Sequence, residues 1–397
     1  MMNRMNFLSP LFLSLAAFFV SIKPAPTNLF LLLAVVTAIA LPQHRQALRA
    51  HLASAPGLAA IALFLGLCAT QLYSASTWAQ ADEYLWKYAR LAYIPFVAAA
   101  MLNAQHKQQV LLAFVAGMLL TLALSFGNAW VPGFCNALHI RDCGPPENPF
   151  IFKQHITHGF FMALAAGLMA HWAYTQRGTA RGVAWAVLSA LAFYNVMFMM
   201  EGRTAWVIVL VFVAVLLARK LGYARAAALA VLLGVPVLWW LVRHVDHFPM
   251  LVQALDEYRE WQATGVAPGR SGMRLTYYSH AIAAMVQHPW FGHGLGATRD
   301  ALNLAPLEPK IYALNNPHNQ FLLFGVQAGL VGLAAYAVFY GLLFKATSQT
   351  PALALPGQCF LLAFAVGNCF NSFHFDMSEA VLFVIACAVF CFRSARS

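Results

Sequence analysis

The residues with the clearest capacity for chemistry lie at 315–319, in the sequence Asn-Asn-Pro-His-Asn, before an apolar run through Gly329 and Gly332. Pro317 should end any preceding helix, and the run after it is long enough to cross a membrane. His318 is therefore expected where water meets lipid. A neutral imidazole, with an ordinary pKa of ~6.5, can act as general base on a hydroxyl. The alternative is a histidine that only starts the helix and donates to a neighbouring carbonyl.

Three arginines are candidates to bind an anion. Arg203 lies in a hairpin between two apolar runs, and Arg270 and Arg274 are four residues apart around a predicted helix start. A guanidinium offers a rigid fork to phosphate oxygens, and a helix amino terminus also attracts anions. Cations near His318 would help to keep it neutral. The alternatives are a pair between Arg203 and Glu201, and a solvated basic face for the other two.

Lys87 and Arg90 are spaced i, i+3 in a predicted spanning helix, so they share a face. A charge at membrane depth needs a partner or a role, and these two are further candidates for an anion site. Snorkelling of both side chains to the interface is the other explanation.

The remaining polar candidates carry less information. His374 and Asp376 fall in a predicted turn, where they can orient a base or an acceptor sugar. His155 and His158 have a spacing compatible with a metal, but no carboxylate or cysteine partner is obvious. The sequence contains no Asp-x-Asp pair, phosphate-binding loop or nucleophile elbow. We therefore predict no metal and no cofactor.

These residues must be positioned by membrane helices. Of the 397 residues, 61% are hydrophobic and only 9% are charged, and the mean hydropathy is +0.66. Soluble domains carry about 25% charged residues, so a soluble globule is excluded. The net charge of +11 indicates topology and contacts with membrane lipids, and no nucleic acid is expected as a partner.

About twelve transmembrane helices are predicted, at ~20 apolar residues each. They fall at 7–22, 27–41, 55–72, 84–102, 109–130, 156–174, 183–200, 204–218, 226–242, 319–344, 357–374 and 378–392. If the amino terminus is cytoplasmic, that face collects 12 of the 24 lysines and arginines, namely Arg4, Arg45, Arg49, Lys107, Arg177, Arg181, Arg219, Lys220, Arg225, Lys345, Arg393 and Arg396. The positive-inside rule thus predicts two cytoplasmic termini.

The predicted fold is an all-α polytopic membrane protein with three parts: residues 1–242 with the first nine spans, 243–318 as a large outer loop, and 319–397 with the last three spans. Within the loop, helical patterns at 250–262 and 271–286 flank a Gly/Pro break that includes Pro268. These patterns predict a compact helical cap over the outer face.

Two of the seven cysteines, Cys135 and Cys143, lie in another outer loop, at about 131–155. An oxidising compartment would allow them to form a disulfide, and two unpaired thiols are the alternative. The other five cysteines fall in apolar spans and are expected to be small core residues.

The motif around His318 resembles that of O-antigen ligases. His318-Asn319, nine residues and then Gly329-Leu330-Val331-Gly332 is similar to that family's histidine, polar residue, nine-residue spacer and Gly-x-x-Gly. The spacing is fairly specific, and the membrane-edge Arg203 also resembles a family arginine.

A second block extends this resemblance. Residues 288–294, His-Pro-Trp-Phe-Gly-His-Gly, are similar to the His-Pro-x-x-Gly-x-Gly block of the wider ligase and polymerase superfamily. Arg274 and Tyr278 match its Arg-x-x-x-aromatic pattern, so Arg274 is favoured over Arg270. The motifs cover about 200–335, and the whole chain resembles the family in topology.

The resemblance implies a metal-independent, inverting glycosyltransferase of lipopolysaccharide biosynthesis. Its donor would be an undecaprenyl-pyrophosphate-linked O-antigen glycan, and its acceptor a sugar hydroxyl of lipid A-core, on the periplasmic face of the bacterial inner membrane. His318 would be the base, Arg203 and Arg274 would bind the pyrophosphate, and Asn319 could orient the acceptor.

Two alternatives stay open at this point. An O-antigen polymerase or a protein O-oligosaccharyltransferase of the same superfamily would differ only in its acceptor. A transporter of lipid-linked sugars would suit twelve spans, but transporters tend to show internal repeats and polar sites at the membrane midplane. Here the polar residues gather at one edge.

Overall fold

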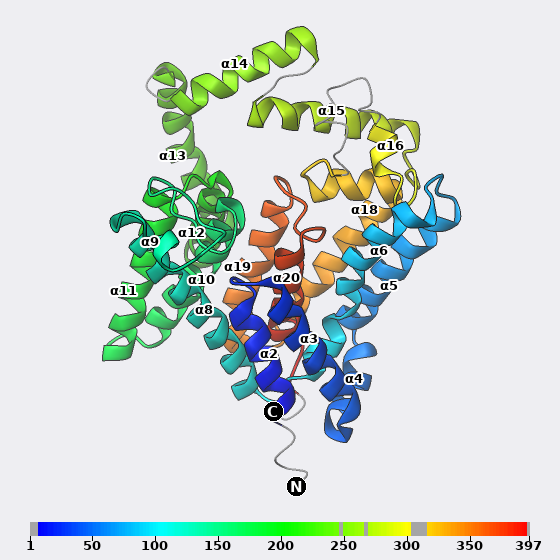
Figure 1. The fold of residues 1–397 in the computed structure, drawn as a ribbon, viewed down its shortest axis with the longest axis vertical. Coiled ribbons are helices and arrows are strands. Elements are labelled where there is room, and N and C mark those ends of the chain that lie inside the picture. Colours follow the sequence, from blue (N-terminus) through cyan, green and yellow to red (C-terminus); the bar gives the residue numbers. More distant parts are fainter. Residues whose placement is uncertain (1–6, 246–248, 266–268, 303–315, 395–397) are drawn as a thin grey trace.

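The computed structural model describes residues 7–245, 249–265, 269–302 and 316–394, and within these the regular elements are helices (Figure 1). Four residues named above, Arg4, Pro268, Asn315 and Arg396, lie outside the described residues.

The first half of the chain contains α2 (Leu8–Phe19), α3 (Pro24–Ala40), α4 (Pro42–Leu52), α5 (Ala55–Ala69), η1 (Thr70–Leu72), α6 (Trp78–Ala92), α7 (Ile94–Ala99), α8 (Ala104–Trp130), α9 (Phe134–Ala137), α10 (His155–Thr175), α11 (Ala180–Tyr194) and η2 (Asn195–Met199). The second half contains α12 (Arg203–Leu221), α13 (Tyr223–Arg243), α14 (Pro249–Thr264), α15 (Arg270–Gln287), α16 (Thr298–Leu302), α18 (Gln320–Thr347), α19 (Pro351–Gly367) and α20 (Met377–Phe390).

The chain is an all-α membrane protein with several spanning helices. Within the described residues, 6 helical segments are long and apolar enough to cross a membrane, or up to 7 if the bent pair α3 and α4 counts as one span. The helices α2, α19 and α20, and the apolar part of α13, are shorter. Each predicted span overlaps at least one helix, while the total of twelve stays a prediction.

The helix α4 was not predicted. The chain bends by 99° between α3 and α4, because Leu41 is extended and Pro42 starts a new helix. In α4, His44 and Leu48 are buried while Arg45 and Arg49 are exposed. This amphipathic, basic helix has the composition of one that lies along a membrane surface.

The predicted boundaries of two spans were wrong. The predicted span at 357–374 is α19, which ends at Gly367, followed by a polar loop at 368–376. Asn368 Oδ1 accepts a hydrogen bond from Phe373 N at 3.0 Å, which turns the chain where a helix would continue. The predicted span at 84–102 is divided between α6 and α7, because Pro95 occupies the first turn of α7.

The two helical patterns of the large loop are present as α14 and α15. They lie with α16 at one end of the molecule, opposite α4 (Figure 1). Glu257 Oε2 on α14 accepts from Gly272 N in the first turn of α15, at 3.0 Å. Tyr277 and Ala281 on α15 belong to one buried cluster with Val326 of α18. The cap thus packs on the helix that follows His318.

Helix α18 is broken at Gly329, whose φ of 61° and ψ of −159° are not helical. The break leaves the carbonyls of Val326 and Gln327 without their helical donors. His293 N and Gly294 N replace them, at 2.7 and 3.0 Å. The Gly-rich block at 288–294 is therefore a docking loop for the broken helix.

The same loop also accepts hydrogen bonds from the two backbone N–H groups that follow the break. Leu330 N donates to Pro289 O at 2.8 Å, and Val331 N donates to Trp290 O at 3.1 Å. A Cβ on Gly329 would lie 2.4 Å from the carbonyl carbon of Trp290. The absence of a side chain at Gly329 thus admits the backbone of this loop.

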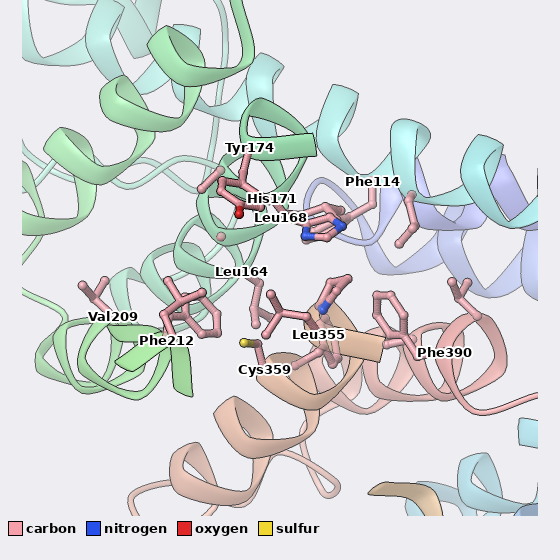
Figure 2. Close-up of a pocket in the computed structure, with 18 of the residues that line it drawn as sticks. Phe114, Leu164, Leu168, His171, Tyr174, Val209, Phe212, Leu355, Cys359 and Phe390 are labelled. Atoms are coloured by element: carbon pink, nitrogen blue, oxygen red, sulfur yellow. The ribbon is translucent and has the colours of Figure 1, made fainter. Parts of the chain in front are cut away.

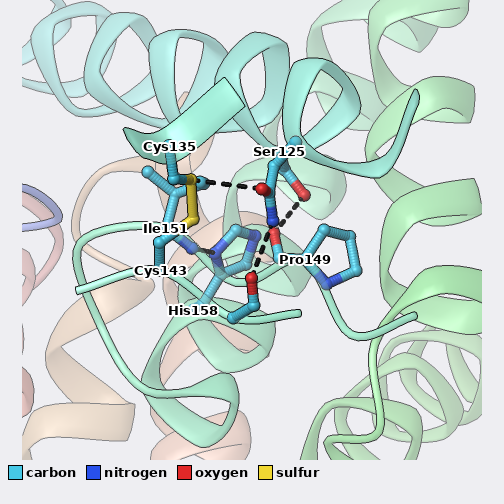
Figure 3. The surroundings of a disulfide bond; sticks show 8 residues. Ser125, Cys135, Cys143, Pro149, Ile151 and His158 are labelled. Carbon is cyan, nitrogen blue, oxygen red and sulfur yellow. Dashed lines mark hydrogen bonds between the residues drawn. A yellow bond between two sulfur atoms is a disulfide. The ribbon is translucent and has the colours of Figure 1, made fainter. Parts of the chain in front are cut away.

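Cys135 and Cys143 form a disulfide in the loop after α8 (Figure 3). Ser125 Oγ donates to Pro149 O at 2.7 Å, and Asn128 Nδ2 donates to Gly144 O at 2.9 Å. The disulfide and these bonds tie the loop to the end of α8. As predicted, Cys387 and Cys391 are buried, whereas Cys369 is exposed.

The break in α18 generates a prediction for Gly329→Ala. Only glycine adopts this region of φ and ψ without a cost of about 1–3 kcal/mol, and the new methyl group would also meet Trp290. We expect a lower midpoint of thermal unfolding for the purified protein in detergent. Gly341→Ala is the matched control, because a Cβ there meets no atom within 4 Å in the same helix. Equal midpoints for Gly329→Ala and wild type would contradict this account of the break.

Candidate functional site

His318 occupies a constrained turn before α18. Its φ is 54°, a left-handed conformation that is uncommon for any residue except glycine. The turn is held because His318 N donates to Asn316 Oδ1 at 2.9 Å. Asn319 Oδ1 then accepts from Phe321 N and Leu322 N at 3.0 and 3.1 Å, and so caps the helix. The backbone on both sides of the imidazole is therefore fixed.

The loop after α19 supplies the acceptors that hold this turn. Asn319 Nδ2 donates to Cys369 O at 2.8 Å. Gln320 N lies 2.8 Å from Asn368 O and 3.2 Å from Asn371 O. These carbonyls belong to the polar loop at 368–376, which was predicted to be part of a span. That loop positions the start of α18.

The His318 imidazole has the properties of a proton acceptor. Its ring lies 6.1 Å from the ring of Tyr277, and neither ring nitrogen forms a hydrogen bond within the described residues. Burial, and secondarily the charge of Arg274, lowers the pKa of His318. The neutral form with a free lone pair is thus favoured near pH 7.

Arg274 and Tyr278 lie one turn apart on α15. The Tyr278 hydroxyl is 3.1 Å from Cys369 O and 3.4 Å from His318 O, so it joins α15 to both loops. Arg274 is half-buried and forms no ion pair or hydrogen bond within the described residues. Its charge acts on His318 and is available to an anion. Arg270 begins α15, and the described residues do not include its side chain.

Arg203 is the first residue of α12 and is exposed. The next residue, Thr204, accepts a hydrogen bond from Asn371 Nδ2 at 3.4 Å, and Asn371 O is a partner of Gln320 N. Asn371 therefore links Thr204, one residue after Arg203, with Gln320, two residues after His318. Among the described residues Arg203 has no ion-pair partner, so the predicted pair with Glu201 is not formed.

A cavity of about 520 Å³ adjoins Arg203. Its lining includes the π-helical segment η2 before Arg203, Trp206 of α12, and Gln253 and Glu257 of α14. Single turns of π-helix are frequent at functional sites. The cap thus closes one side of a half-polar chamber that holds a free guanidinium.

Lys87 and Arg90 lie beside the end of the polar loop. Lys87 Nζ pairs with Glu83 at 2.7 Å and lies 3.4 Å from the centre of the Phe375 ring, so its charge already has two partners. Arg90 Nη1 is buried without a hydrogen-bond partner in the described part of the chain. Burial and the nearby Glu379 raise the pKa of Asp376 to about 7, although the positive charges of Lys87 and Arg90 act to lower this pKa.

Two of the expected orienting residues are engaged elsewhere. The amide of Asn319 is used by the helix cap and Cys369 O, so its role is to position His318. His374, expected on the outer face, is 1% exposed. Its Nε2 lies 3.0 Å from the Tyr340 hydroxyl and 3.3 Å from Asn368 Nδ2. Burial lowers the pKa of His374 to about 3, and the residue braces the loop from the core.

The histidine pair at the start of α10 also has a structural role. His158 Nδ1 accepts from Ile151 N at 3.0 Å, so Nε2 donates to Asn195 Oδ1 at 3.2 Å (Figure 3). Both nitrogens are thus occupied. Within the described residues, no three His, Cys, Asp or Glu side chains are grouped to hold a metal ion.

The sequence interpretation missed the residues that assemble the site. Asn316, Asn368 and Asn371 connect the start of α18 with α12 and the polar loop. Gln320 Nε2 donates to the Tyr88 hydroxyl at 3.2 Å, and Gln320 Oε1 accepts from His374 N at 3.1 Å. Asn368, Asn371 and Gln320 lie in segments that were predicted to span the membrane, where each polar side chain needs a partner. This was the signal in the sequence that could have identified them.

A comparison with known protein families gives one match. Residues 187–337 match the family model Wzy_C, described as O-antigen ligase. This part of the chain is therefore similar to the O-antigen ligase family, which supports a place in the ligase and polymerase superfamily. Members of this family are glycosyltransferase-like enzymes of O-antigen processing. A comparison with curated proteins found no match.

The O-antigen ligase domain includes some of the candidate residues and excludes others. Arg203, Arg270, Arg274, His318 and Asn319 lie within 187–337, as do the docking loop and Gly329. Lys87, Arg90, His374 and Asp376 lie outside the matched residues. The match thus covers the helices α12, α15 and α18 that carry His318 and the two unpaired arginines.

The environment of His318 generates a prediction for its reactivity with diethyl pyrocarbonate, which modifies neutral imidazole. Because the pKa of His318 is lowered, its modification should have a pH midpoint below ~6.5. Arg274→Gln removes a cation and should raise that midpoint. Mass spectrometry of His318 peptides over pH 5–8 provides the measurement. A midpoint above 6.5, or one that Arg274→Gln does not move, would contradict the assigned environment.

Proposed function

We propose that the protein is an O-antigen ligase: a metal-independent, inverting glycosyltransferase of lipopolysaccharide biosynthesis. It moves O-antigen glycan from undecaprenyl pyrophosphate to a sugar hydroxyl of lipid A-core. Membrane lipids surround it and no cofactor takes part. The observation that carries the proposal is the free imidazole of His318, next to the unpaired Arg274, inside the matched O-antigen ligase domain.

The proposed reaction uses His318 as the base. The acceptor hydroxyl oxygen attacks the anomeric carbon, and its proton passes to a ring nitrogen of His318. The bond between the anomeric carbon and the phosphate oxygen breaks, and undecaprenyl pyrophosphate leaves with the electron pair. Because attack comes from the face opposite the leaving group, the anomeric configuration inverts.

The arginines serve the leaving group in this scheme. Arg203 and Arg274 each lack an internal partner within the described residues, so neither must break an ion pair to bind phosphate. Fixed cations stabilise negative charge that develops on the pyrophosphate. Arg270 begins the same helix and is a further ligand in the proposal. Arg90 and Lys87 are secondary ligands, Lys87 the weaker of the two because Glu83 already pairs with it.

The proposal includes a topology. About twelve spans cross the bacterial inner membrane, with both termini in the cytoplasm and the site on the periplasmic face. The segments 1–242, 243–318 and 319–397 form the first helices, the periplasmic loop and the last helices. The position of the cap at the end opposite the basic helix α4 supports this orientation (Figure 1).

The decisive variant is His318→Ala, assayed as purified protein in detergent with lipid-linked glycan and lipid A-core. Loss of general-base catalysis should lower the rate by about 10²–10⁴-fold. His139→Ala is the matched control, because His139 is exposed and has the same φ of 54°. His139→Ala should retain full activity. Full ligation by His318→Ala at normal protein levels would overturn the proposed role.

Mass spectrometry of the product distinguishes the alternatives in the same assay. Glycan on lipid A-core is expected. Glycan on a second lipid-linked glycan would identify a polymerase, and glycan on protein would identify an oligosaccharyltransferase. Since detergent removes the barrier to transport, any transfer there excludes a transporter as the primary activity.

A further inference from the structure

A second cavity lies between α8, α10, α12, α19 and α20, and its volume is about 650 Å³. Phe114, Leu164, Phe212 and Phe390 are among the side chains around it (Figure 2). Ligand pockets typically measure ~300–1,000 Å³, and most of their lining is apolar. This cavity is therefore large enough for a substantial apolar ligand.

The cavity is at the end of the bundle away from His318. On α12, which starts at Arg203, it begins at Val209 and reaches Lys220 in the last turn. Helix α19 ends at the polar loop that holds the His318 turn. The residues of α19 that line the cavity lie within its first ten residues, from Leu355 to Phe360. The cavity is thus separate from the proposed pyrophosphate site.

The charges at the cavity have one sign. Arg219 and Lys220 both line it and both are exposed. Arg219 Nη2 donates to the side chain of Gln358 on α19, which holds the guanidinium across the gap between the two helices. None of the described residues that line the cavity is acidic. An anion at this rim would meet two cations and no repulsion.

The lip of the cavity is open to the membrane. Val213 and Leu216 of α12 both line it and are 47% and 49% exposed. An apolar chamber with an apolar lip and a cationic rim is complementary to a molecule with hydrocarbon chains and an anionic head. Basic pockets between membrane helices bind phospholipid head groups in this way.

We propose that this cavity binds one anionic phospholipid from the leaflet at the Arg219 end. Its phosphate contacts Arg219 and Lys220, and an acyl chain lies among Leu164, Phe212 and Phe390. A zwitterionic lipid would add a positive group beside two cations, so it should bind more weakly. The glycan donor would hold its pyrophosphate at the other end of the bundle and leave this rim empty.

The test is native mass spectrometry of the whole protein, purified in neutral detergent with added phosphatidylglycerol or phosphatidylcholine. Wild type should retain one phosphatidylglycerol, and phosphatidylcholine on the order of tenfold less. Arg219→Gln with Lys220→Gln should lower phosphatidylglycerol retention by a similar factor. Arg45→Gln with Arg49→Gln is the matched control, because these exposed arginines do not line the cavity.

A second variant tests the chamber independently of charge. Val213→Trp adds bulk at the lip, so it should reduce retention while both cations remain. Size-exclusion chromatography checks that each variant is folded. Equal retention of phosphatidylcholine by wild type, or full retention of phosphatidylglycerol by the folded Arg219/Lys220 variant or by folded Val213→Trp, would overturn the proposal. A polyprenyl phosphate that displaces phosphatidylglycerol at equal concentration would also overturn it, by identifying a different lipid.

Discussion

The site depends on how a broken membrane helix satisfies its backbone. Helix α18 loses its helical hydrogen bonds at Gly329, and in a membrane each unsatisfied group is costly. The docking loop at 288–294 replaces them with two donors and two acceptors. This exchange fixes α18 against the cap, and the polar loop at 368–376 fixes its first residue. His318 comes two residues before the residue that the polar loop fixes, and its own N donates to Asn316 Oδ1, which accounts for its constrained backbone. The nine-residue spacer between Asn319 and Gly329 is the part of α18 that precedes the break.

The two ends of the helical bundle differ in chemistry. At one end, Arg203 on α12, Arg274 on α15 and His318 before α18 are the groups that the proposed transfer from a pyrophosphate would use. At the other end, Arg219 and Lys220 lie at an apolar cavity suited to a lipid. Helix α12 joins the two, because it begins at Arg203 and ends beyond Lys220. Both ends therefore offer cations to phosphate, and the first also carries His318, the proposed base.

Helices were predictable where long apolar runs met clear stop signals, as in α8 and α10, and where helical patterns flanked a Gly/Pro break, as in the cap helices α14 and α15. The predicted span at 357–374 was wrong at its end, where a loop contains few polar and several aromatic residues. The start of the segment 368–376 was assigned to a span because the hydropathy of Phe370, Phe373 and Phe375 outweighs that of Asn368 and Asn371. His318 and the arginines were predictable from residue type and position. Their supporting bonds were not, because backbone carbonyls such as Cys369 O have no signature in sequence.

The measurement that tests the central claim most directly is a structure of the protein with undecaprenyl-pyrophosphate-linked glycan bound. The account predicts that the phosphates contact Arg203 and Arg274, with the anomeric carbon facing the side of the pocket where His318 can reach an acceptor hydroxyl. Phosphates far from both arginines, with His318 remote from the sugar, would contradict it.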